Sequence, residues 1–153
     1  MQKIVLLTIG RLRESWAQDG AAFYVDRLKH VLKLEVMELP ASREVDSERQ
    51  KQDESRRILK FIDGYDADIW ILDEHGKGMT SPAFADEIGK ARDSGRTLLF
   101  ILGGSYGLTD QVRSMGRQLR LSDMVLPHEL CRVFFLEQLY RATEINKGSG
   151  YHH

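Results

Sequence analysis

The sequence predicts an α/β fold in which a mostly parallel sheet carries helices on both faces. Short, continuously apolar segments alternate along the chain with longer segments of helical character. Strands that are apolar throughout are typical of parallel sheets covered on both faces. A length of 153 residues suits one hydrophobic core, and no linker, repeat or low-complexity segment is apparent. We therefore expect a single domain over residues 1–153.

In the first half of the chain, apolar runs predict strands at residues 2–8, 34–39 and 67–73, and helices are expected at 15–30 and 47–61. Gly10 ends the first strand and Pro40 the second, since both residues interrupt regular structure. Ser47 and Gln50 have the spacing of a capping box at the start of the second helix. The apolar anchors of the first helix are expected to be Trp16, Phe23, Leu28 and Val31.

In the second half, a helix is expected at residues 81–93, a strand at 97–102, a short helix at 109–116, a short strand at 119–121 and a long helix at 127–147. Ser81 followed by Pro82 combines a capping residue with a first-turn proline. Gly95 ends that helix. The strand at 97–102 is apolar throughout, from Leu98 to Leu102, as expected for a parallel sheet covered on both faces.

The last helix is apolar on nearly all sides, and such a helix is buried on most sides. A small domain offers few places to surround a helix. We therefore expect one side to pack on the sheet and another on a second copy of the chain across a two-fold axis. A central helix in a monomer is the alternative. Arg132 is expected on an exposed turn, away from the Glu137–Arg141 pair and without a partner in the helix.

Composition restricts the classes of partner. The net charge of −1 argues against coating nucleic acid by bulk electrostatics, although Lys51, Arg56, Arg57 and Lys60 are an alternative set of phosphate contacts. No apolar run is long enough to span a bilayer. The single cysteine, Cys131, is expected to be buried and permits no internal disulfide, which fits a cytoplasmic protein. His30, His75 and His128 lack partners at zinc spacing, so no metal site is expected.

A glycine-rich turn, Leu102–Leu108, follows a predicted strand and precedes a helix. In open parallel sheets, ligands bind beyond the carboxyl ends of the strands, where glycines allow close approach to the backbone. The segment Leu72–Lys77 ends another strand and should lie beside this turn. The turn lacks both the dinucleotide pattern and the P-loop pattern. Asp73 and Glu74 are adjacent on a strand and point to opposite faces, so they do not form a carboxylate pair.

Several motifs together carry a resemblance to a known family: Leu72–Lys77, Leu102–Leu108, Leu126–Val133, Glu137–Ala142 and Tyr151–His153. On these residues the chain resembles the ribosomal RNA large subunit methyltransferase H family of SPOUT methyltransferases. The resemblance implies a C-terminal trefoil knot, a homodimer and S-adenosylmethionine as methyl donor. It also implies that the acceptor is N3 of a pseudouridine in bacterial 23S rRNA within the ribosome, with no role for DNA, a membrane or a metal.

By the same resemblance, the donor pocket would comprise Leu72, Gly103, Gly104, Leu121, Ser122, Asp123, Met124, Val125 and Leu126. This composition suits S-adenosylmethionine, which carries no phosphate and needs backbone hydrogen bonds and an apolar slot. The candidates for deprotonating or orienting the acceptor base are His128, Arg132, Tyr151 and His152. General acid–base catalysis of this kind increases a reaction rate by about 10²–10⁴-fold.

The C-terminal tail has no visible role in the core, and we expect it to fold over the site at the dimer interface, with Tyr151 stacking on a base. The chain departs from the family at Gly150, where proline commonly precedes the Tyr-His pair. Two other functions remain open at this point. The chain could be a SPOUT methyltransferase acting on another RNA, such as a tRNA, or a non-catalytic RNA-binding dimer.

Overall fold

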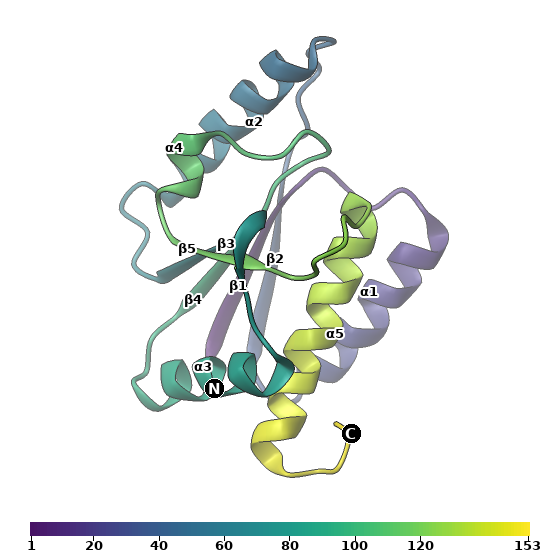
Figure 1. Cartoon of the computed structure of the whole chain (residues 1–153), viewed down its shortest axis with the longest axis vertical. Coiled ribbons are helices and arrows are strands. Elements are labelled where there is room, and N and C mark those ends of the chain that lie inside the picture. Colours follow the sequence, from purple (N-terminus) through teal and green to yellow (C-terminus); the bar gives the residue numbers. More distant parts are fainter.

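A computed structural model describes residues 1–153 as a five-stranded sheet with helices on both sides (Figure 1). The strands are β1 (Lys3–Ile9), β2 (Lys33–Leu39), β3 (Asp68–Gly78), β4 (Leu98–Leu102) and β5 (Arg117–Arg120). They lie in the order β2-β1-β4-β3-β5, and every neighbouring pair is parallel. This arrangement confirms the predicted fold class and brings the carboxyl ends of the strands to one edge.

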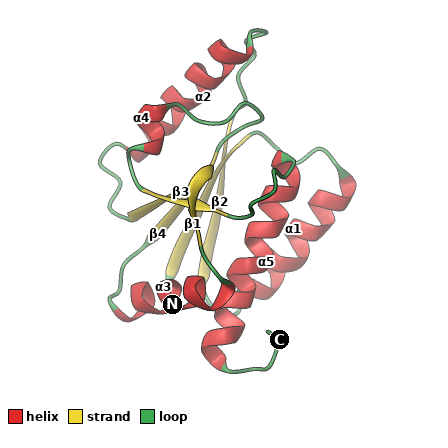
Figure 2. Cartoon of the chain, viewed as in Figure 1, coloured by secondary structure: helices red, strands yellow, loops and turns green.

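Four helices connect the strands, namely α1 (Ser15–Leu28), α2 (Ser47–Ile62), α3 (Ser81–Asp93) and α4 (Asp110–Arg113), and α5 (His128–Lys147) follows the last strand. Helices α1, α3 and α5 cover one face of the sheet, and α2 and α4 cover the other (Figure 2). Alternate residues of β1 supply the two cores. Leu6 packs in the cluster that contains Phe135 of α5, and Leu7 packs in the cluster that contains Ile58 of α2. None of the helices combines the length and apolar character needed to cross a bilayer.

Helices α2 and α3 start at the predicted residues, but their N-caps lie one residue earlier than predicted. The N-cap of α2 is Asp46, whose carboxylate accepts a hydrogen bond from the backbone N–H of Arg49 at 2.9 Å. The N-cap of α3 is Thr80, whose hydroxyl accepts from the N–H of Ala83 at 3.2 Å. An N-cap residue keeps an extended backbone while its side chain bonds to the first turn. Ser47 and Ser81, the predicted caps, are therefore the first helical residues.

Strand β3 continues beyond its predicted end at Asp73. Its pairing with β5 shifts between Leu72 and Lys77, both of which lie opposite Leu119. The residues between them bulge out of the ladder at the carboxyl edge of the sheet. A Cβ at Gly76 would lie 2.8 Å from the backbone of Leu119, so the bulge needs a glycine there. Asp73 and His75 lie in this bulge and line a cavity at the carboxyl edge of the sheet.

Helix α5 lies between α1 and α3, with Phe135 and Leu139 fully buried beneath it. Helix α1 packs through its small residues and Leu28. Two of its expected anchors, Trp16 and Phe23, are instead half-exposed, each with 50% of its surface accessible. The prediction for these two aromatic residues was wrong for a single copy of the chain, because the close packing of α1 and α5 leaves them on the outer side.

Candidate functional site

The carboxyl ends of β3 and β4 and the segment after β5 enclose a cavity of about 450 Å³, here called the donor cavity. Eight of the nine predicted donor-pocket residues line it: Leu72, Gly103, Gly104, Leu121, Ser122, Met124, Val125 and Leu126. The exception is Asp123, whose side chain is 89% exposed and forms an ion pair with Arg120 at 2.9 Å. The fold thus assembles one cavity from segments that lie some fifty positions apart in the sequence.

Two glycines of the turn have no room for a side chain. A Cβ at Gly103 would lie 2.7 Å from a methyl carbon of Leu108, and one at Gly104 would lie 2.4 Å from Oε1 of Glu54. The turn closes through a hydrogen bond from the N–H of Gly107 to the carbonyl of Gly104, at 3.1 Å. At these two positions the cavity wall is therefore bare backbone, which suits a ligand recognised through main-chain hydrogen bonds.

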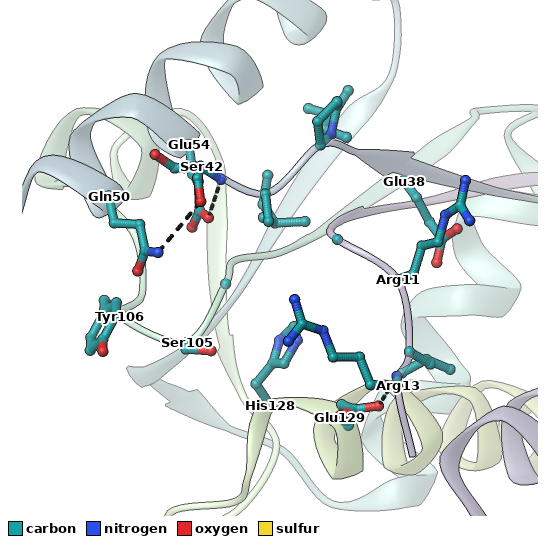
Figure 3. Close-up of a pocket in the computed structure, with 17 residues that line it drawn as sticks. Arg11, Arg13, Glu38, Ser42, Gln50, Glu54, Ser105, Tyr106, His128 and Glu129 are labelled. Carbon is teal, nitrogen blue, oxygen red and sulfur yellow. Dashed lines mark hydrogen bonds between the residues drawn. The ribbon is translucent and has the colours of Figure 1, made fainter. Parts of the chain in front are cut away.

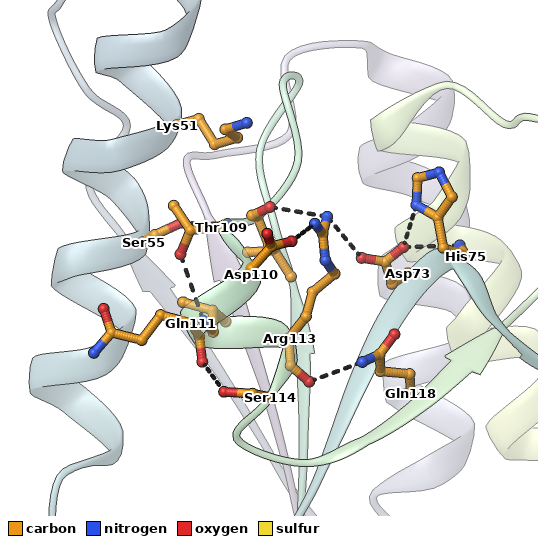
Figure 4. Close-up of polar contacts among 12 residues, drawn as sticks. Lys51, Ser55, Asp73, His75, Thr109, Asp110, Gln111, Arg113, Ser114 and Gln118 are labelled. Atoms are coloured by element: carbon orange, nitrogen blue, oxygen red, sulfur yellow. Dashed lines mark hydrogen bonds and ion pairs between the residues drawn. The ribbon is translucent and has the colours of Figure 1, made fainter.

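A polar network that sequence reasoning missed holds the donor cavity together (Figure 4). Arg113 donates to the carbonyl of Leu108 at 3.1 Å and lies 3.5 Å from the nearly buried carboxylate of Asp73. It also pairs with Asp110, and this hydrogen bond is the main cause that raises the pKa of Arg113. Asp73 accepts from the N–H of His75 at 2.8 Å. The network ties the end of the glycine turn to the bulge of β3.

Cys131 faces the donor cavity and is half-buried, whereas the sequence predicted a buried residue. Its thiol donates to the carbonyl of Leu126 at 3.7 Å. Burial, and to a lesser extent the charge of Glu74, raises the pKa of the thiol above its usual value. The thiol is therefore protonated at neutral pH and contributes an apolar surface to the cavity.

A second, larger cavity of about 990 Å³ adjoins the first (Figure 3). We call it the open cavity. Its walls come from the loop between β1 and α1, the end of β2 and helix α2, and it shares Gly104, Ser105, Tyr106 and His128 with the donor cavity. His128 thus stands at the junction of the two spaces. Its Nδ1 atom is buried and has no hydrogen-bond partner within the chain.

The first turn of α5 holds the loop between β1 and α1. The carboxylate of Glu129 accepts hydrogen bonds from the backbone N–H groups of Arg13 at 2.7 Å and Glu14 at 3.1 Å. These bonds, that from Glu14 first, lower the pKa of Glu129. The loop carries Arg11 and Arg13 into the wall of the open cavity. No local pattern in the sequence indicated this contact between its two ends.

Arg132 does not occupy the exposed position that the sequence predicted. It is only 3% exposed, and its Nη1 forms an ion pair with Glu38 at 2.6 Å, while its Nη2 donates to the carbonyl of Gly10 at 3.0 Å. The Nε atom has no partner. The prediction failed because both partners are brought to α5 by the fold, 94 and 122 positions away in the sequence. Arg132 contacts the open cavity only through these partners.

Tyr151 and His152 lie at the opposite end of α5 from His128. The helix contains 20 residues and is about 30 Å long. The ring of Tyr151 packs on Tyr140 with centroids 5.1 Å apart, and burial raises its pKa. His152 lies 3.0 Å from Arg141. One copy of the chain therefore does not bring the tail to its own cavities.

Gly150 adopts a backbone angle φ of +82°. Proline is restricted to φ of about −65° and cannot adopt this conformation. The turn that folds the tail back on α5 thus depends on the glycine by which this chain departs from the pattern expected for its relatives.

Comparisons with known proteins give the class and the family of this chain. A family model described as "Predicted SPOUT methyltransferase" matches residues 2–152. A crystal structure of a hypothetical protein superposes with a TM-score of 0.55 over 94% of this chain and 68% of the other, at 15% identity, which supports the fold alone. The class of protein defined by this match is the SPOUT methyltransferases.

Relatives that match over their full length identify the family within this class. The ribosomal RNA large subunit methyltransferase H of Pelobacter propionicus is 39% identical to this chain, and the match covers 99% of both. Proteins of the same name from Trichlorobacter lovleyi and Lactococcus lactis subsp. cremoris are each 40% identical, over 99% and 98% of this chain and 99% of their own lengths. The chain therefore belongs to the ribosomal RNA large subunit methyltransferase H family.

Proposed function

We propose that the protein transfers the methyl group of S-adenosylmethionine to N3 of a pseudouridine in bacterial 23S rRNA, within the assembled ribosome and hence in the cytoplasm. The observation that carries this proposal is the convergence of eight predicted donor-binding residues on one cavity. The cavity suits the nucleoside, because backbone at Gly103 and Gly104 is left bare by clashes that exclude any side chain. A sulfonium donor supplies an already activated methyl group, so the protein mainly aligns it with the acceptor.

The acceptor would meet the donor at the junction of the two cavities. His128 lines both cavities there, and its buried Nδ1 has no hydrogen-bond partner within the chain. The N3 imide is weakly acidic and must lose its proton, a step to which a positioned base contributes about 10²–10⁴-fold. We assign this role to His128. Arg132 acts in this proposal as a positioning residue, because it holds Glu38 and Gly10 at the open cavity.

The proposal includes a homodimer and a C-terminal trefoil knot. The half-exposed Trp16 and Phe23 on α1 would be covered by a second copy, and Val133 and Tyr140 of α5 remain partly exposed beside them. A two-fold arrangement would carry the tail of each copy to the cavities of the other. Tyr151 and His152 would then close the site over the acceptor base.

Ribosomes from a strain that lacks the modification test the reaction, with the methylated nucleotide located by mass mapping. We expect methylation at one pseudouridine and weak activity on naked rRNA fragments, because a protein of net charge −1 has little surface for recognising RNA alone. Methylation of a tRNA instead would contradict the substrate. No binding of S-adenosylmethionine in calorimetry would indicate a non-catalytic RNA-binding dimer.

Truncation after Ser149 tests the tail. We expect the truncated protein to bind S-adenosylmethionine with the affinity of the full chain, because the donor cavity contains no tail residue. Methylation of ribosomes should be abolished. Normal methylation by the truncated protein would exclude a role for Tyr151 and His152 in the site, and sedimentation of both proteins would show whether dimerisation is retained.

A further inference from the structure

We propose that Arg11 and Arg13 bind backbone phosphates of an RNA strand at the open cavity, on either side of the nucleotide whose base enters the junction at His128. The inference rests on the proposed function for the identity of the RNA. It adds the residues that hold the strand, which neither the family resemblance nor the candidate catalytic residues supply.

The proposal is based on the charged side chains around the open cavity and on the partners that each of them has within the chain. Three carboxylates line it, and each already accepts a hydrogen bond from the protein. Glu38 pairs with Arg132 at 2.6 Å, Glu54 accepts from the N–H of Ser42 at 3.0 Å, and Glu129 accepts from the N–H of Arg13 at 2.7 Å.

The two arginines of the open cavity, unlike its carboxylates, have no partner within the chain. Arg11 and Arg13 are exposed, and their guanidinium groups form no hydrogen bond or ion pair within the chain. By contrast, Arg56 and Arg57 of α2, two of the four alternative phosphate contacts, both pair with Asp53. Arg11 and Arg13 are therefore the charged side chains of the open cavity that have no hydrogen bond or ion pair within the chain, whereas each of its carboxylates has one. A guanidinium group is suited to phosphate because it donates two parallel hydrogen bonds.

The loop that carries the two arginines is fixed in place. Glu129 holds the backbone of Arg13, and Arg132 holds the carbonyl of Gly10. Figure 3 shows Arg13 beside His128 and Glu129, and Arg11 further along the same loop, beside Glu38. A fixed loop loses less conformational entropy on binding than a mobile one. The arginines are thus held at the entrance to the junction at which the acceptor base would meet the donor.

The size and position of the open cavity favour a nucleotide strand over a small molecule. Its volume of about 990 Å³ is at the upper end of the range for small-ligand pockets. It joins the donor cavity through Gly104, Ser105, Tyr106 and His128, so a base can enter the junction while its phosphates stay outside. A protein of net charge −1 needs such a local contact, because its overall field does not attract RNA.

Replacement of the arginines tests the proposal. Arg11→Gln, Arg13→Gln and the double variant remove charge from exposed side chains, and their thermal midpoints should equal that of the unaltered protein. The matched control is Lys33→Gln, which removes one charge at the amino end of β2, at the opposite edge of the sheet. Binding of a fluorescein-labelled oligouridylate is measured by anisotropy over a range of KCl concentrations, and donor binding is measured by calorimetry.

We expect each arginine variant to bind the oligouridylate roughly tenfold more weakly, as for loss of one charged hydrogen bond. The slope of log affinity against log salt should decrease by about 0.7 for each lost phosphate contact. The affinity for S-adenosylmethionine should not change. With ribosomes as substrate, KM should increase while kcat stays constant. Arg11→Lys and Arg13→Lys should recover most of the salt dependence, because they restore the charge.

An unchanged affinity and salt slope in the double variant would overturn the proposal, as would an equal loss in Lys33→Gln or no binding by the unaltered protein at the lowest salt. The oligouridylate measurement does not depend on methylation. A reduced slope together with inactivity of the unaltered protein on ribosomes would support phosphate binding and exclude the proposed function. Methylation of ribosomes by the unaltered protein, together with an unchanged slope in the double variant, would support the proposed function and exclude phosphate binding by the two arginines.

Discussion

Replacing the two partners of the ion pair between Arg132 and Glu38 should reduce the stability of the protein by different amounts. Replacing Glu38 with alanine leaves the Arg132 guanidinium, 3% exposed, without a counter-charge. Replacing Arg132 with methionine leaves a carboxylate that is 37% exposed and can be hydrated. We therefore expect Glu38→Ala to destabilise the protein more than Arg132→Met, although both break the same contact.

The exposure of Glu38 and the hydrogen bonds of Arg132 determine how much unfolding free energy each variant should lose. Breaking a buried pair costs about 3–5 kcal/mol, and the partial exposure of Glu38 places Glu38→Ala near the lower limit, at about 3 kcal/mol. Arg132→Met leaves the carbonyl of Gly10 without its donor, which costs about 1–3 kcal/mol, but it also removes the unpartnered Nε. A net loss of about 1–2 kcal/mol follows. The double variant should lose less than the sum of the two single losses.

Urea unfolding at one fixed protein concentration measures these losses, since association changes apparent stability. Thermal midpoints provide a second readout, at about 2–4 °C per kcal/mol for a chain of this length. If Arg132→Met proves to be the more destabilising variant, or if the two losses simply add, the assignment of Arg132 as a buried structural cation is refuted.

Three further predictions follow from single contacts. Gly104→Ala should cost about 1–3 kcal/mol of stability and weaken donor binding in calorimetry, because its Cβ would displace the Glu54 carboxylate; unchanged donor affinity would contradict this. Iodoacetamide should alkylate Cys131 slowly at pH 8 and faster only above pH 9, because its pKa is raised; the rate of a free thiol at pH 8 would be the contrary result. The pKa of Glu129 is lowered on folding, so its contribution is present above about pH 4.3 and lost as the pH falls through the folded value. Urea midpoints of Glu129→Gln should thus lie below those of the unaltered protein at pH 7 and converge with them in acid, and a constant difference would exclude this linkage.

Local pattern was sufficient for the sheet and for most of the helices. The apolar run ending at Leu102 indicated β4, and Gly95 ended the preceding helix as expected. The continuation of β3 beyond Asp73 was not predictable, because its bulge consists of polar residues with no periodicity. The N-caps were displaced by one position, since Asp46 and Ser47 are both acceptable capping residues and only the backbone angles distinguish them.

The site was predictable only where a motif was contiguous. The run from Leu121 to Leu126 lines the donor cavity as the resemblance implied, apart from Asp123. The open cavity was missed because its walls come from five separate segments that only the topology brings together. The burial of Arg132 was missed for the same reason, as Glu38 is 94 positions away.

The bonds from Glu129 to the loop at Arg13 and Glu14 join positions 116 and 115 residues apart. During synthesis, the amino-terminal half emerges long before α5 exists. Both cavities consequently stay unformed until the first turn of α5 has been translated. Newly made protein thus completes both cavities late and in one step, rather than gradually as each strand joins the sheet.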